Sequence, residues 1–422
     1  MNLSVYGEIG HDILLDSETI IPRTGGAGLY AALAAARQSV NVNFLTVYGP
    51  EINKYSIAVW NKMGVSFDYA LEIDNYSLPK YLVTGFKAYE KKKSVAMTDI
   101  TLGIEYSPSL SSESNGLLMF PIDHSLPVEL CIEAYEKGIP VFLDPKTNNK
   151  SISSARNLLK YTTILLVNEE EAFQITSTNN LKEAIEALLH CGSKYTILKR
   201  GHHGSILISK DGILNFPAYQ SKVRCTLGSG DIFAGALAAT YLRTQDIDYS
   251  IKISTCVAAN FIESFETESI INRAGVEQDI LIREYRLSTT LKKAIYLAGP
   301  FFSEQQLIWL NLVCNSLKNA GFQVLSPSSE NGIITKDTTF EERKHIFNQD
   351  IKLLEEAEFM VALLDHDDPG TFFEIGYAFK KKIPVFALKT SPFHINNMIL
   401  FGCISVSSSI EELVDLLYRY GE

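Results

Sequence analysis

The sequence predicts an α/β protein with a largely parallel sheet, followed by a second and smaller α/β domain. Short runs rich in β-branched and aromatic residues alternate with longer helical patterns along the chain, which is typical of this fold class. A polar and charged stretch at 283–293 interrupts the alternation, and a new strand pattern starts directly after it. Because 422 residues suffice for more than one core, we place a domain boundary in this stretch.

The composition excludes several classes of protein. Apolar residues make up 46% of the chain, which is too high a share for a disordered protein. The 38 Lys and Arg against 49 Asp and Glu give a net charge of −11, which disfavours a nucleic-acid partner. The sequence has no run of 18 apolar residues and does not start with a basic segment before an apolar core. We therefore expect a cytoplasmic protein without a membrane partner.

The first domain, residues 1–288, carries the longer series of elements. Its strands are expected at 3–6, 42–47, 141–144, 163–167 and 196–199. Helices are expected at 28–38, where alanine dominates, and at 232–242. Between about 66 and 104, Tyr, Val, Thr and Phe recur in polar surroundings without helical periodicity, which indicates a small β-sheet lid.

A linker at 289–293 leads to the second domain, residues 294–422. Its strands are expected at 294–298, 323–325, 359–364 and 384–388. Its helices are expected at 304–320, 340–356, 371–381 and 409–420. This order is typical of a flavodoxin-like doubly wound parallel sheet, which binds ligands beyond the carboxyl ends of its strands.

A loop of small residues, Cys225-Thr-Leu-Gly-Ser-Gly-Asp231, precedes an apolar helical pattern. Gly228, Ser229 and Gly230 allow a tight turn in which the N–H groups of a helix start converge on an anion. Asp231 would then lie beside the anion, where it can accept a proton from an attacking hydroxyl group. By itself, the pattern is more often an ordinary glycine turn with a carboxylate at the helix start.

Three further polar segments lie where strands end and helices or loops begin: Asp12, Gly25-Gly26 and Asn168 to Glu171. Open α/β sheets bind their ligands at this edge. With this set of segments, the sequence resembles the ribokinase-like (PfkB) carbohydrate and nucleoside kinase family over residues 1–288. The resemblance implies a ribokinase-like α/β sandwich with a small β lid.

The resemblance also implies a role for each of these residues. Asp231 is the implied base, and the implied anion hole is formed by Gly228 to Gly230. Asn168 and Glu171 would organise the Mg²⁺ ion of MgATP through water, so that ATP and Mg²⁺ are the implied cofactors. Sugar hydroxyl groups would be held under the lid by Asp12, Gly25 and Gly26.

One position departs from the family pattern. Members usually begin the loop motif with Asp-Thr, and in many of them that Asp helps to bind a monovalent cation, whereas here Cys225 precedes Thr226. Potassium activation is therefore not expected. The departure favours an alternative in which the first domain is a non-catalytic nucleoside- or nucleotide-binding module that regulates the second domain.

In the second domain, several carboxylates follow an apolar strand. Asp365, Asp367 and Asp368 come first, and Glu374 follows six positions after Asp368. Two nearby carboxyl groups suit glycosidic-bond chemistry, one as an ionised nucleophile and the other as a proton donor. Thr371-Phe-Phe-Glu374 also fits a capping box, which from the spacing alone is the more frequent explanation of Glu374.

The wider arrangement decides between these two interpretations. Tyr296 lies on the first strand of the domain, Asp350 lies on the helix that precedes the carboxylates, and Asn396 and Met398 follow the fourth strand. From Asp368 onward the sequence has the form Asp-Pro-Gly-x-x-x-Glu-x-Gly-x-Ala. This set resembles the nucleoside 2-deoxyribosyltransferase family over residues 294–422.

By this resemblance, Glu374 is the nucleophile that forms a covalent 2-deoxyribosyl intermediate, and Tyr296 orients it. Asp350 would handle the proton of the base, and Asp368 would bind the sugar hydroxyl groups. In the family, a neighbouring subunit contributes an Asn-x-Met segment to the pocket. Asn396 and Met398 match this segment. A homo-oligomer is therefore expected, and no cofactor is implied for this domain.

Together the two resemblances imply a bifunctional enzyme of nucleoside salvage. One domain would cleave or transfer the N-glycosidic bond of 2′-deoxynucleosides, and the other would phosphorylate a sugar or nucleoside with MgATP. The expected partners are thus nucleosides, bases, sugars and ATP.

Because Asp368 would repel a 5′-phosphate, free deoxynucleosides are favoured over nucleoside monophosphates. A nucleotide-depleting hydrolase is a further alternative, and transfer is not distinguished from hydrolysis, since water and an acceptor base attack the same intermediate.

Overall fold

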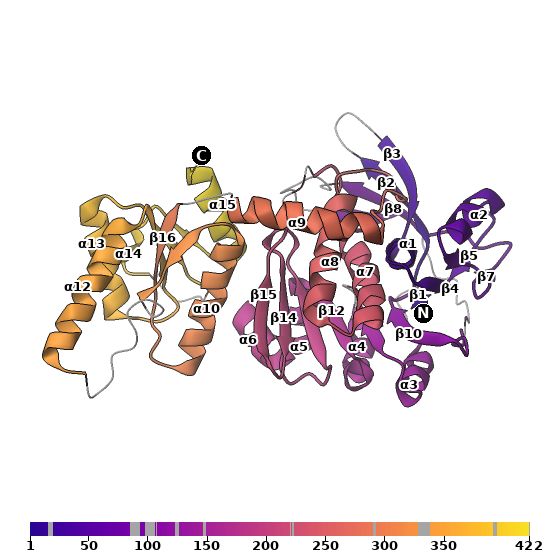
Figure 1. The fold of residues 1–422 in the computed structure, drawn as a ribbon, viewed down its shortest axis with the longest axis horizontal. Helices are drawn as coiled ribbons and strands as arrows, with labels where there is room; N and C mark the ends of the chain where they lie inside the picture. The colour runs from indigo at the N-terminus through magenta and orange to yellow at the C-terminus, as the bar shows by residue number, and fades with distance from the viewer. Residues whose placement is uncertain are drawn as a thin grey trace. The chain divides into compact units, whose positions relative to one another are not determined.

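The computed structural model of the chain describes residues 1–15, 20–84, 93–97, 106, 108–122, 126–146, 149–219, 221, 223–289, 293–327, 338–390 and 395–421. The chain divides into two compact units, Met1–Tyr285 and Arg286–Glu422 (Figure 1). The linker expected at 289–293 stays a prediction, because residues 290–292 lie outside the described residues. Among the helices of the described residues, none combines the length and apolar character that a bilayer crossing requires.

The first unit is built on a nine-stranded sheet with the order β15-β14-β13-β12-β11-β10-β1-β4-β6. The strands are β1 (Asn2–Tyr6), β4 (Asn41–Leu45), β6 (Val65–Ser66), β10 (Ser114–Met119), β11 (Val141–Leu143), β12 (Ile164–Asn168), β13 (Tyr195–Lys199), β14 (Ser205–Ser209) and β15 (Gly212–Phe216). All pairs from β13 to β6 are parallel, and only the β13–β14 and β14–β15 pairs are antiparallel. The predicted, largely parallel sheet is confirmed.

Three helices of the first unit pack against one another, as Figure 1 shows for α7 and α8: α1 (Ala27–Arg37), α7 (Ser229–Thr244) and α8 (Ile247–Phe261). Ala31, Ala32, Ala34 and Ala35 of α1 are fully buried, and their small side chains keep its surface flat. A Cβ atom on Gly235 of α7 would overlap the carbonyl oxygen of Ala31. Small residues on both helices thus permit a close approach that brings α1 beside the start of α7.

Five further helices of this unit are α2 (Lys54–Lys62), α3 (Val128–Glu136), α4 (Asn149–Leu158), α5 (Glu169–Thr176) and α6 (Leu181–Leu188). They connect the strands in the alternation that a parallel sheet requires. A last helix, α9 (Arg273–Thr289), follows α8 and extends beyond Tyr285, where the first unit ends. A two-stranded parallel pair, β5 (Val47–Tyr48) and β7 (Leu71–Glu72), lies outside the main sheet.

A separate four-stranded sheet has the order β3-β2-β8-β9. Its strands are β2 (Gly10–Leu15), β3 (Ile20–Gly25), β8 (Lys80–Thr84) and β9 (Lys93–Ala96). The small β-sheet was expected from residues 66–104 alone, and two of its strands come instead from the N-terminal segment. This difference matters for the site, because Asp12 lies inside β2 and not in a loop after β1. Much of the expected segment, residues 85–92 and 98–105, lies outside the described residues.

The second unit contains a five-stranded sheet with the order β17-β16-β18-β19-β20. The strands are β16 (Ala294–Ala298), β17 (Gln323–Leu325), β18 (Phe359–Leu363), β19 (Val385–Leu388) and β20 (Ser405–Ser407). Every pair is parallel, and in chain order the sheet reads 2-1-3-4-5, which is the flavodoxin-like order. The predicted doubly wound sheet is confirmed, with β20 as an additional strand that its short polar sequence did not indicate.

Helices connect these strands: α10 (Glu304–Asn319), α12 (Phe340–Glu356), α13 (Pro369–Lys381), α14 (Asn397–Leu400) and α15 (Ile410–Gly421). The core beneath them consists of apolar side chains from the middle strands, including Tyr296, Met360, Ala362 and Ala387, each fully buried. Ile375 and Ala378 of α13 join this core. Their spacing fixes which face of α13 turns inward, and Glu374 lies directly beside Ile375 on that helix.

Candidate active sites

The expected base of the first unit lies in a cluster of opposite charges. Asp231 is in the first turn of α7, and its Oδ1 accepts a hydrogen bond from the ammonium group of Lys146. Lys146 Nζ also lies 3.4 Å from Asp144 Oδ1, and Lys199 Nζ donates to Asp144 Oδ2. Lys199 reaches the expected anion hole as well, since its Nζ lies 3.7 Å from where a Cβ atom of Gly230 would be.

The sequence interpretation missed three members of this cluster, Asp144, Lys146 and Lys199. A signal for them existed, because Asp144 directly follows β11 and Lys199 ends β13, at the carboxyl edge of the parallel sheet. Burial alone would raise the pKa of the fully buried Asp144, but the ammonium groups of Lys146 and Lys199 lower it below its ordinary value. Asp144 and Asp231 in turn raise the pKa of Lys146, against the effect of its burial. Ion pairs thus connect all four groups, from Asp231 through Lys146 and Asp144 to Lys199.

The loop before α7 is compatible with the anion-hole interpretation at Gly228 and Gly230, whereas the Ser229 N–H donates to the carbonyl oxygen of Thr226 at 3.2 Å. Gly228 adopts a φ of 85°, and a Cβ atom at this position would lie 2.9 Å from the ring of Tyr30. A glycine is needed here for both reasons. Within the described part of the chain, the N–H groups of Gly228 and Gly230 have no backbone acceptor, and they lie at the start of a long helix. Such a helix start attracts anions.

Asn168 and Glu171 have a structural role at the start of α5. The Asn168 side chain accepts from the Glu171 N–H, and Glu171 Oε2 accepts from the Asn168 N–H, each at 2.8 Å. This reciprocal pair is a capping box. Burial and the neighbouring Asp144 carboxylate raise the pKa of Glu171, while Lys199 and Lys146 oppose the increase.

The surroundings of Glu171 fit a magnesium ion that keeps most of its water. Glu171 and Asp144 are buried carboxylates close enough to influence each other, and oxygen ligands are those that Mg²⁺ prefers. No group of three or more His, Cys, Asp or Glu arranged to hold a metal occurs among the described residues. A site completed by water and phosphate oxygens, as is usual for Mg²⁺, agrees with both observations.

The expected sugar-binding residues meet beside the anion hole. Tyr30 on α1 donates its hydroxyl to Asp12 Oδ2 at 2.6 Å. A Cβ atom on Gly25 would overlap both groups, and Gly26 turns the chain into α1 with a φ of 96°. Burial and Asp12 raise the pKa of Tyr30, and the more distant charge of Asp231 contributes to the increase. Asp12, Gly25 and Asp231 therefore lie around the same tyrosine, which the sequence interpretation did not include.

In the second unit, Glu374 is not part of a capping box. Asp368 is the residue that caps α13, because its Oδ2 accepts from the Thr371 N–H and from Thr371 Oγ1, both at 2.7 Å. Glu374 Oε1 instead accepts a 2.5 Å hydrogen bond from the hydroxyl of Tyr296, whose side chain is fully buried at the centre of β16. The explanation of Glu374 as a helix cap is therefore wrong. The carboxyl group of Glu374 instead contacts a residue of strand β16.

The electrostatics of Glu374 are unusual for a glutamate. Burial raises its pKa to about 7, the hydrogen bond from Tyr296 opposes this increase, and the carboxylates of Asp350 and Asp368 add to it. Burial and Glu374 also raise the pKa of Tyr296, which therefore stays a neutral hydrogen-bond donor. The structure thus brings Tyr296, Asp350, Asp368 and Glu374 within electrostatic reach of one another. A carboxyl group that titrates near neutral pH can serve as a nucleophile once it has lost its proton.

The last two expected residues lie on the surface of the second unit. Asn396 caps the short helix α14, where its Oδ1 accepts from the Met398 N–H at 2.8 Å. The side chain of Met398 is 82% exposed. Further apolar side chains near it in the chain are also exposed, namely Leu400, Phe401 and Ile404.

Comparison with known proteins supports the division into two functional segments. Residues 117–273 match the pfkB family carbohydrate kinase model, and residues 295–403 match the nucleoside 2-deoxyribosyltransferase model. The chain is 25% identical over 277 residues to the bifunctional ribokinase/ribose-5-phosphate isomerase A of Fructilactobacillus sanfranciscensis, a match that covers 62% of the chain and 48% of that protein. It is 23% identical to the cytidine kinase of Thermococcus kodakarensis, over 60% of the chain and 93% of that kinase.

Similar solved structures have the ribokinase-like fold. The nucleoside kinase of Burkholderia thailandensis in complex with inosine has a TM-score of 0.55 at 16% identity, and the match covers 67% of the present chain and 98% of that kinase. The ribokinase of Arabidopsis thaliana in complex with ribose and ATP has a TM-score of 0.54 at 19% identity, with 66% and 98% covered. The chain therefore joins, in this order, a segment that matches the pfkB carbohydrate kinase family and a segment that matches the nucleoside 2-deoxyribosyltransferase family, as the sequence predicts.

Proposed function

We propose that the protein is a bifunctional enzyme of nucleoside salvage. The second unit cleaves or transfers the N-glycosidic bond of 2′-deoxynucleosides, and the first unit phosphorylates a hydroxyl group of a sugar or nucleoside with MgATP. The observation that carries the proposal is the hydrogen bond from Tyr296 to Glu374, which holds a carboxyl group with a pKa of about 7 beside two other carboxylates. No role in capping or in an ion pair explains this arrangement.

In the second unit, the reaction starts with ionised Glu374. One carboxylate oxygen forms a bond to C1′ of the deoxyribose, and the C1′–N bond to the base breaks as the base leaves with a proton from Asp350. In the second step, a nitrogen of an acceptor base or the oxygen of water attacks C1′ and releases Glu374, while Asp350 takes up the proton. Tyr296 holds Glu374 in place in both steps through its hydroxyl group.

Asp368 supports a preference for free nucleosides. One of its oxygens caps α13, so the position of this carboxylate is fixed relative to Glu374 on the same helix. A fixed carboxylate can accept a hydrogen bond from a sugar hydroxyl group but repels a 5′-phosphate. The proposed substrates are therefore 2′-deoxynucleosides without a phosphate.

The surface around α14 supports a homo-oligomer. Met398 and Phe401 are 82% and 77% exposed, and exposed apolar side chains that gather on one short segment are typical of an interface between subunits. Asn396 and Met398 would reach the pocket of a neighbouring second unit from this surface. The kinase and transferase activities would then coexist in an assembly of identical chains.

In the first unit, Asp231 acts as the base. Its carboxylate takes the proton of the substrate hydroxyl, whose oxygen forms a bond to the γ-phosphorus as the bond to the ADP oxygen breaks. The N–H groups of Gly228 and Gly230 and the ammonium group of Lys199 surround the site where negative charge develops. Asp12 holds the other hydroxyl groups of the substrate. Glu171 and Asp144 would hold the water shell of Mg²⁺, which supplies charge neutralisation when bound.

A second candidate function has one specific observation in its favour. The ion pair between Lys146 and Asp231 occupies one oxygen of the carboxylate. A first unit that only binds a nucleoside or nucleotide, and thereby regulates an N-glycosidase, needs no base at this position. In that case the ion pair would be a permanent structural contact.

A single incubation tests the proposal. The full chain is mixed with deoxyinosine, adenine and MgATP, and deoxyadenosine, free hypoxanthine, phosphorylated products and ADP are measured. We expect deoxyadenosine or free base together with ADP that depends on a nucleoside or sugar. Base exchange without ADP formation would support the regulatory module. In a parallel incubation, deoxyinosine is replaced by its 5′-monophosphate, and release of base from the monophosphate alone would support a nucleotide hydrolase. Absence of all products would overturn both activities.

A further inference from the structure

A buried guanidinium group lies directly behind the anion-hole loop. Arg23 on β3 is 9% exposed, and its Nη2 donates to the carbonyl oxygen of Leu227 at 2.8 Å. Its Nη1 donates to the carbonyl oxygen of Phe265 at 3.3 Å. The guanidinium carbon also lies 5.1 Å from the ring centre of Tyr30 and 5.7 Å from that of Phe261. The guanidinium of Arg23, on β3, thus connects the anion-hole loop with the segment after α8.

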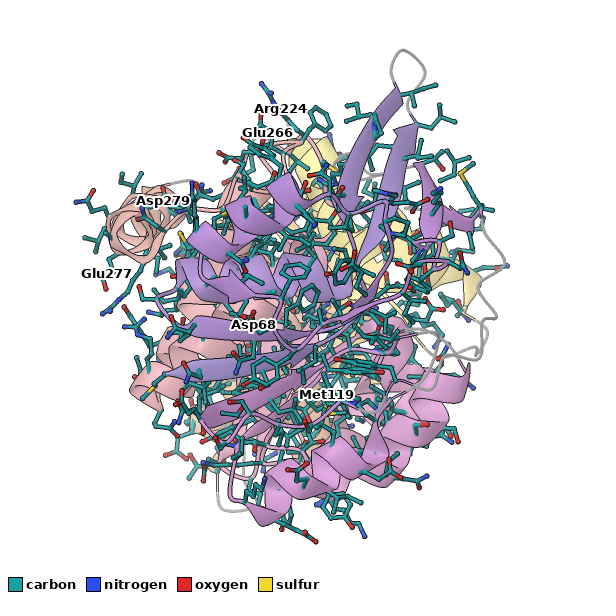
Figure 2. All side chains as sticks on the ribbon, turned by 90° about the vertical axis from the view of Figure 1, so that its right-hand side faces the viewer. Asp68, Met119, Arg224, Glu266, Glu277 and Asp279 are labelled. Carbon is teal, nitrogen blue, oxygen red and sulfur yellow. The ribbon has the colours of Figure 1, made fainter. Side chains whose placement is uncertain are left out.

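The two loops that Arg23 joins are also held together by their backbones. The N–H groups of Arg224 and Cys225 both donate to the carbonyl oxygen of Ile262, at the end of α8. Thr267 Oγ1 donates to the carbonyl oxygen of Thr24, next to Arg23, at 2.7 Å. Arg224 and Glu266, which precede or follow these segments in the chain, are labelled in Figure 2. The carbonyl groups around Arg23 therefore belong to a closely connected structure.

We propose that Arg23 is a built-in cation that orients the anion hole, so that phosphoryl transfer in the first unit needs no bound monovalent metal ion. The inference rests on the proposed kinase function and names a positioning residue for it. The carbonyl group of Leu227 and the N–H group of Gly228 belong to one planar peptide unit and point in opposite directions. A donor that fixes the Leu227 oxygen on one side therefore fixes the Gly228 N–H on the other, toward the anion.

The surroundings of Arg23 explain why a guanidinium serves here. Converging backbone carbonyl groups are the ligands that a potassium ion accepts in proteins. In this chain the space between the carbonyl groups of Leu227 and Phe265 is occupied by the guanidinium, and the nearby Cys225 is a fully buried thiol without a negative charge. Stacking on Tyr30 and Phe261 compensates the planar cation for the loss of water.

The test compares cations and variants in the full chain. ADP formation is measured with ribose, cytidine and inosine as acceptors, in buffers whose cation is potassium, sodium or tetramethylammonium. We expect equal wild-type rates in all three buffers. Arg23→Ala should lower the rate by roughly a hundredfold in tetramethylammonium, as expected for a displaced catalytic group. Millimolar guanidinium should restore much of that loss, and potassium part of it, because either ion can enter the space left between the carbonyl groups.

Arg37→Ala is the matched control. Arg37 also donates to a backbone carbonyl group after α8, that of Ile270 at 3.1 Å, but it does not contact the anion-hole loop. Its variant should show neither a large loss nor rescue by guanidinium. Arg23→Lys keeps the charge and should lose less activity than Arg23→Ala, and thermal unfolding of each variant shows whether it has folded.

Amide hydrogen exchange separates failure of this inference from failure of the kinase proposal. Exchange in residues 225–244 should be independent of the buffer cation in the wild type, faster in Arg23→Ala, and slowed again by guanidinium. This pattern would support the role of Arg23 even if no acceptor yields ADP, in which case only the kinase proposal fails. A wild-type rate or exchange pattern that depends on potassium, or an Arg23→Ala variant that guanidinium does not change, would overturn the inference.

Discussion

The two candidate sites place carboxyl groups in opposite electrostatic surroundings. In the first unit, Asp144 and Asp231 contact the ammonium groups of Lys146 and Lys199. In the second unit, Glu374 receives a hydrogen bond from the neutral hydroxyl of Tyr296 and lies near other carboxylates. The fully buried Asp144 has a lowered pKa, whereas the less buried Glu374 has a pKa raised to about 7.

The comparison shows that burial raises the pKa of a carboxyl group unless neighbouring ammonium groups outweigh it, as they do at Asp144 and not at Glu374. Glu171 supports this view from within the first unit, because burial and then the neighbouring Asp144 carboxylate raise its pKa although both ammonium groups are near. The first site holds its proposed base in an ion pair with an ammonium group. The second is suited to a carboxyl group that changes its protonation state near neutral pH.

The largest expected effect is the loss of the nucleophile. Glu374→Ala should lower base exchange and deoxynucleoside hydrolysis by roughly 10⁴-fold, because no covalent intermediate can form. Production of free base and of exchanged nucleoside is followed by chromatography. Glu355→Ala is the matched control, since Glu355 also accepts a hydrogen bond from a tyrosine, Tyr377, at 2.6 Å. Near-normal exchange by Glu374→Ala would remove the basis for a chemical role of the second site.

The next effect concerns the ion-paired base of the first unit. Asp231→Asn should lower ATP-dependent phosphorylation by about 10²–10⁴-fold and leave base exchange unchanged. ADP release by the full chain measures this. Asp248→Asn serves as the control, because Asp248 likewise lies in the first turn of a helix of this unit but is exposed. Equal ADP release by Asp231→Asn and the wild type would contradict the proposed base.

A smaller and more specific effect is expected at Tyr296. Its hydrogen bond lowers the pKa of Glu374, so Tyr296→Phe should raise that pKa above about 7 and shift the rising limb of kcat/KM for exchange to higher pH. We also expect about a tenfold lower rate at neutral pH, the size typical of one lost hydrogen bond to a charged group. A pH profile of each variant measures both. Tyr377 lies on α13 like Glu374, and Tyr377→Phe should leave the rising limb in place. An unshifted limb in Tyr296→Phe would show that Tyr296 does not influence the ionisation of Glu374.

Much of the fold follows from local patterns in the sequence. The apolar strands are confirmed because their runs of apolar residues are distinct, and the helix at Phe340–Glu356 is confirmed with a capping box of Thr339 and Glu342 at its start. The strand at Ser405–Ser407 was missed because three residues with two serines carry no such periodicity. The N-terminal half of the lid sheet was missed for another reason. Asp12 and Arg23 pair across β2 and β3, and the polar residues of these strands resemble a loop when they are read without their partners.

The candidate sites show the same limit. Glu374, Tyr296 and Asp231 could be predicted because each lies in a motif of fixed spacing. Lys146, Lys199 and Arg23 were missed, although Lys199 ends a strand, because their significance comes from contacts with residues 55 to 242 positions away in the chain. Spacing also failed to show which residue caps the start of α13, because Thr371 and Glu374 fit a capping box as well. There Asp368, and not Thr371, caps the helix.

The smallest expected effect connects the second site to stability. The pKa of Glu374 is about 7 in the folded chain, against an ordinary value of 4.5. Between pH 4.5 and 7, the folded state therefore holds a proton on Glu374 that the unfolded state has released. The stability that the proton confers is full below pH 4.5 and is lost as the pH rises through about 7. Glutamine does not titrate. Glu374→Gln should therefore gain about 1–2 kcal/mol over the wild type between pH 4.5 and 8, after allowance for the partial exposure of Glu374.

Urea unfolding at several pH values measures this difference. The fluorescence of Trp309 reports on the second unit and that of Trp60 on the first, which provides an internal reference in the same sample. We expect a pH-dependent gain only in the Trp309 transition, and no such gain in Glu355→Gln. The hydrogen bond from Tyr296 opposes the shift, so Tyr296→Phe should enlarge the pH dependence. A gain that is constant with pH would mean that Glu374 is already ionised throughout this range, and the contrast between the two sites would then be one of geometry and not of protonation.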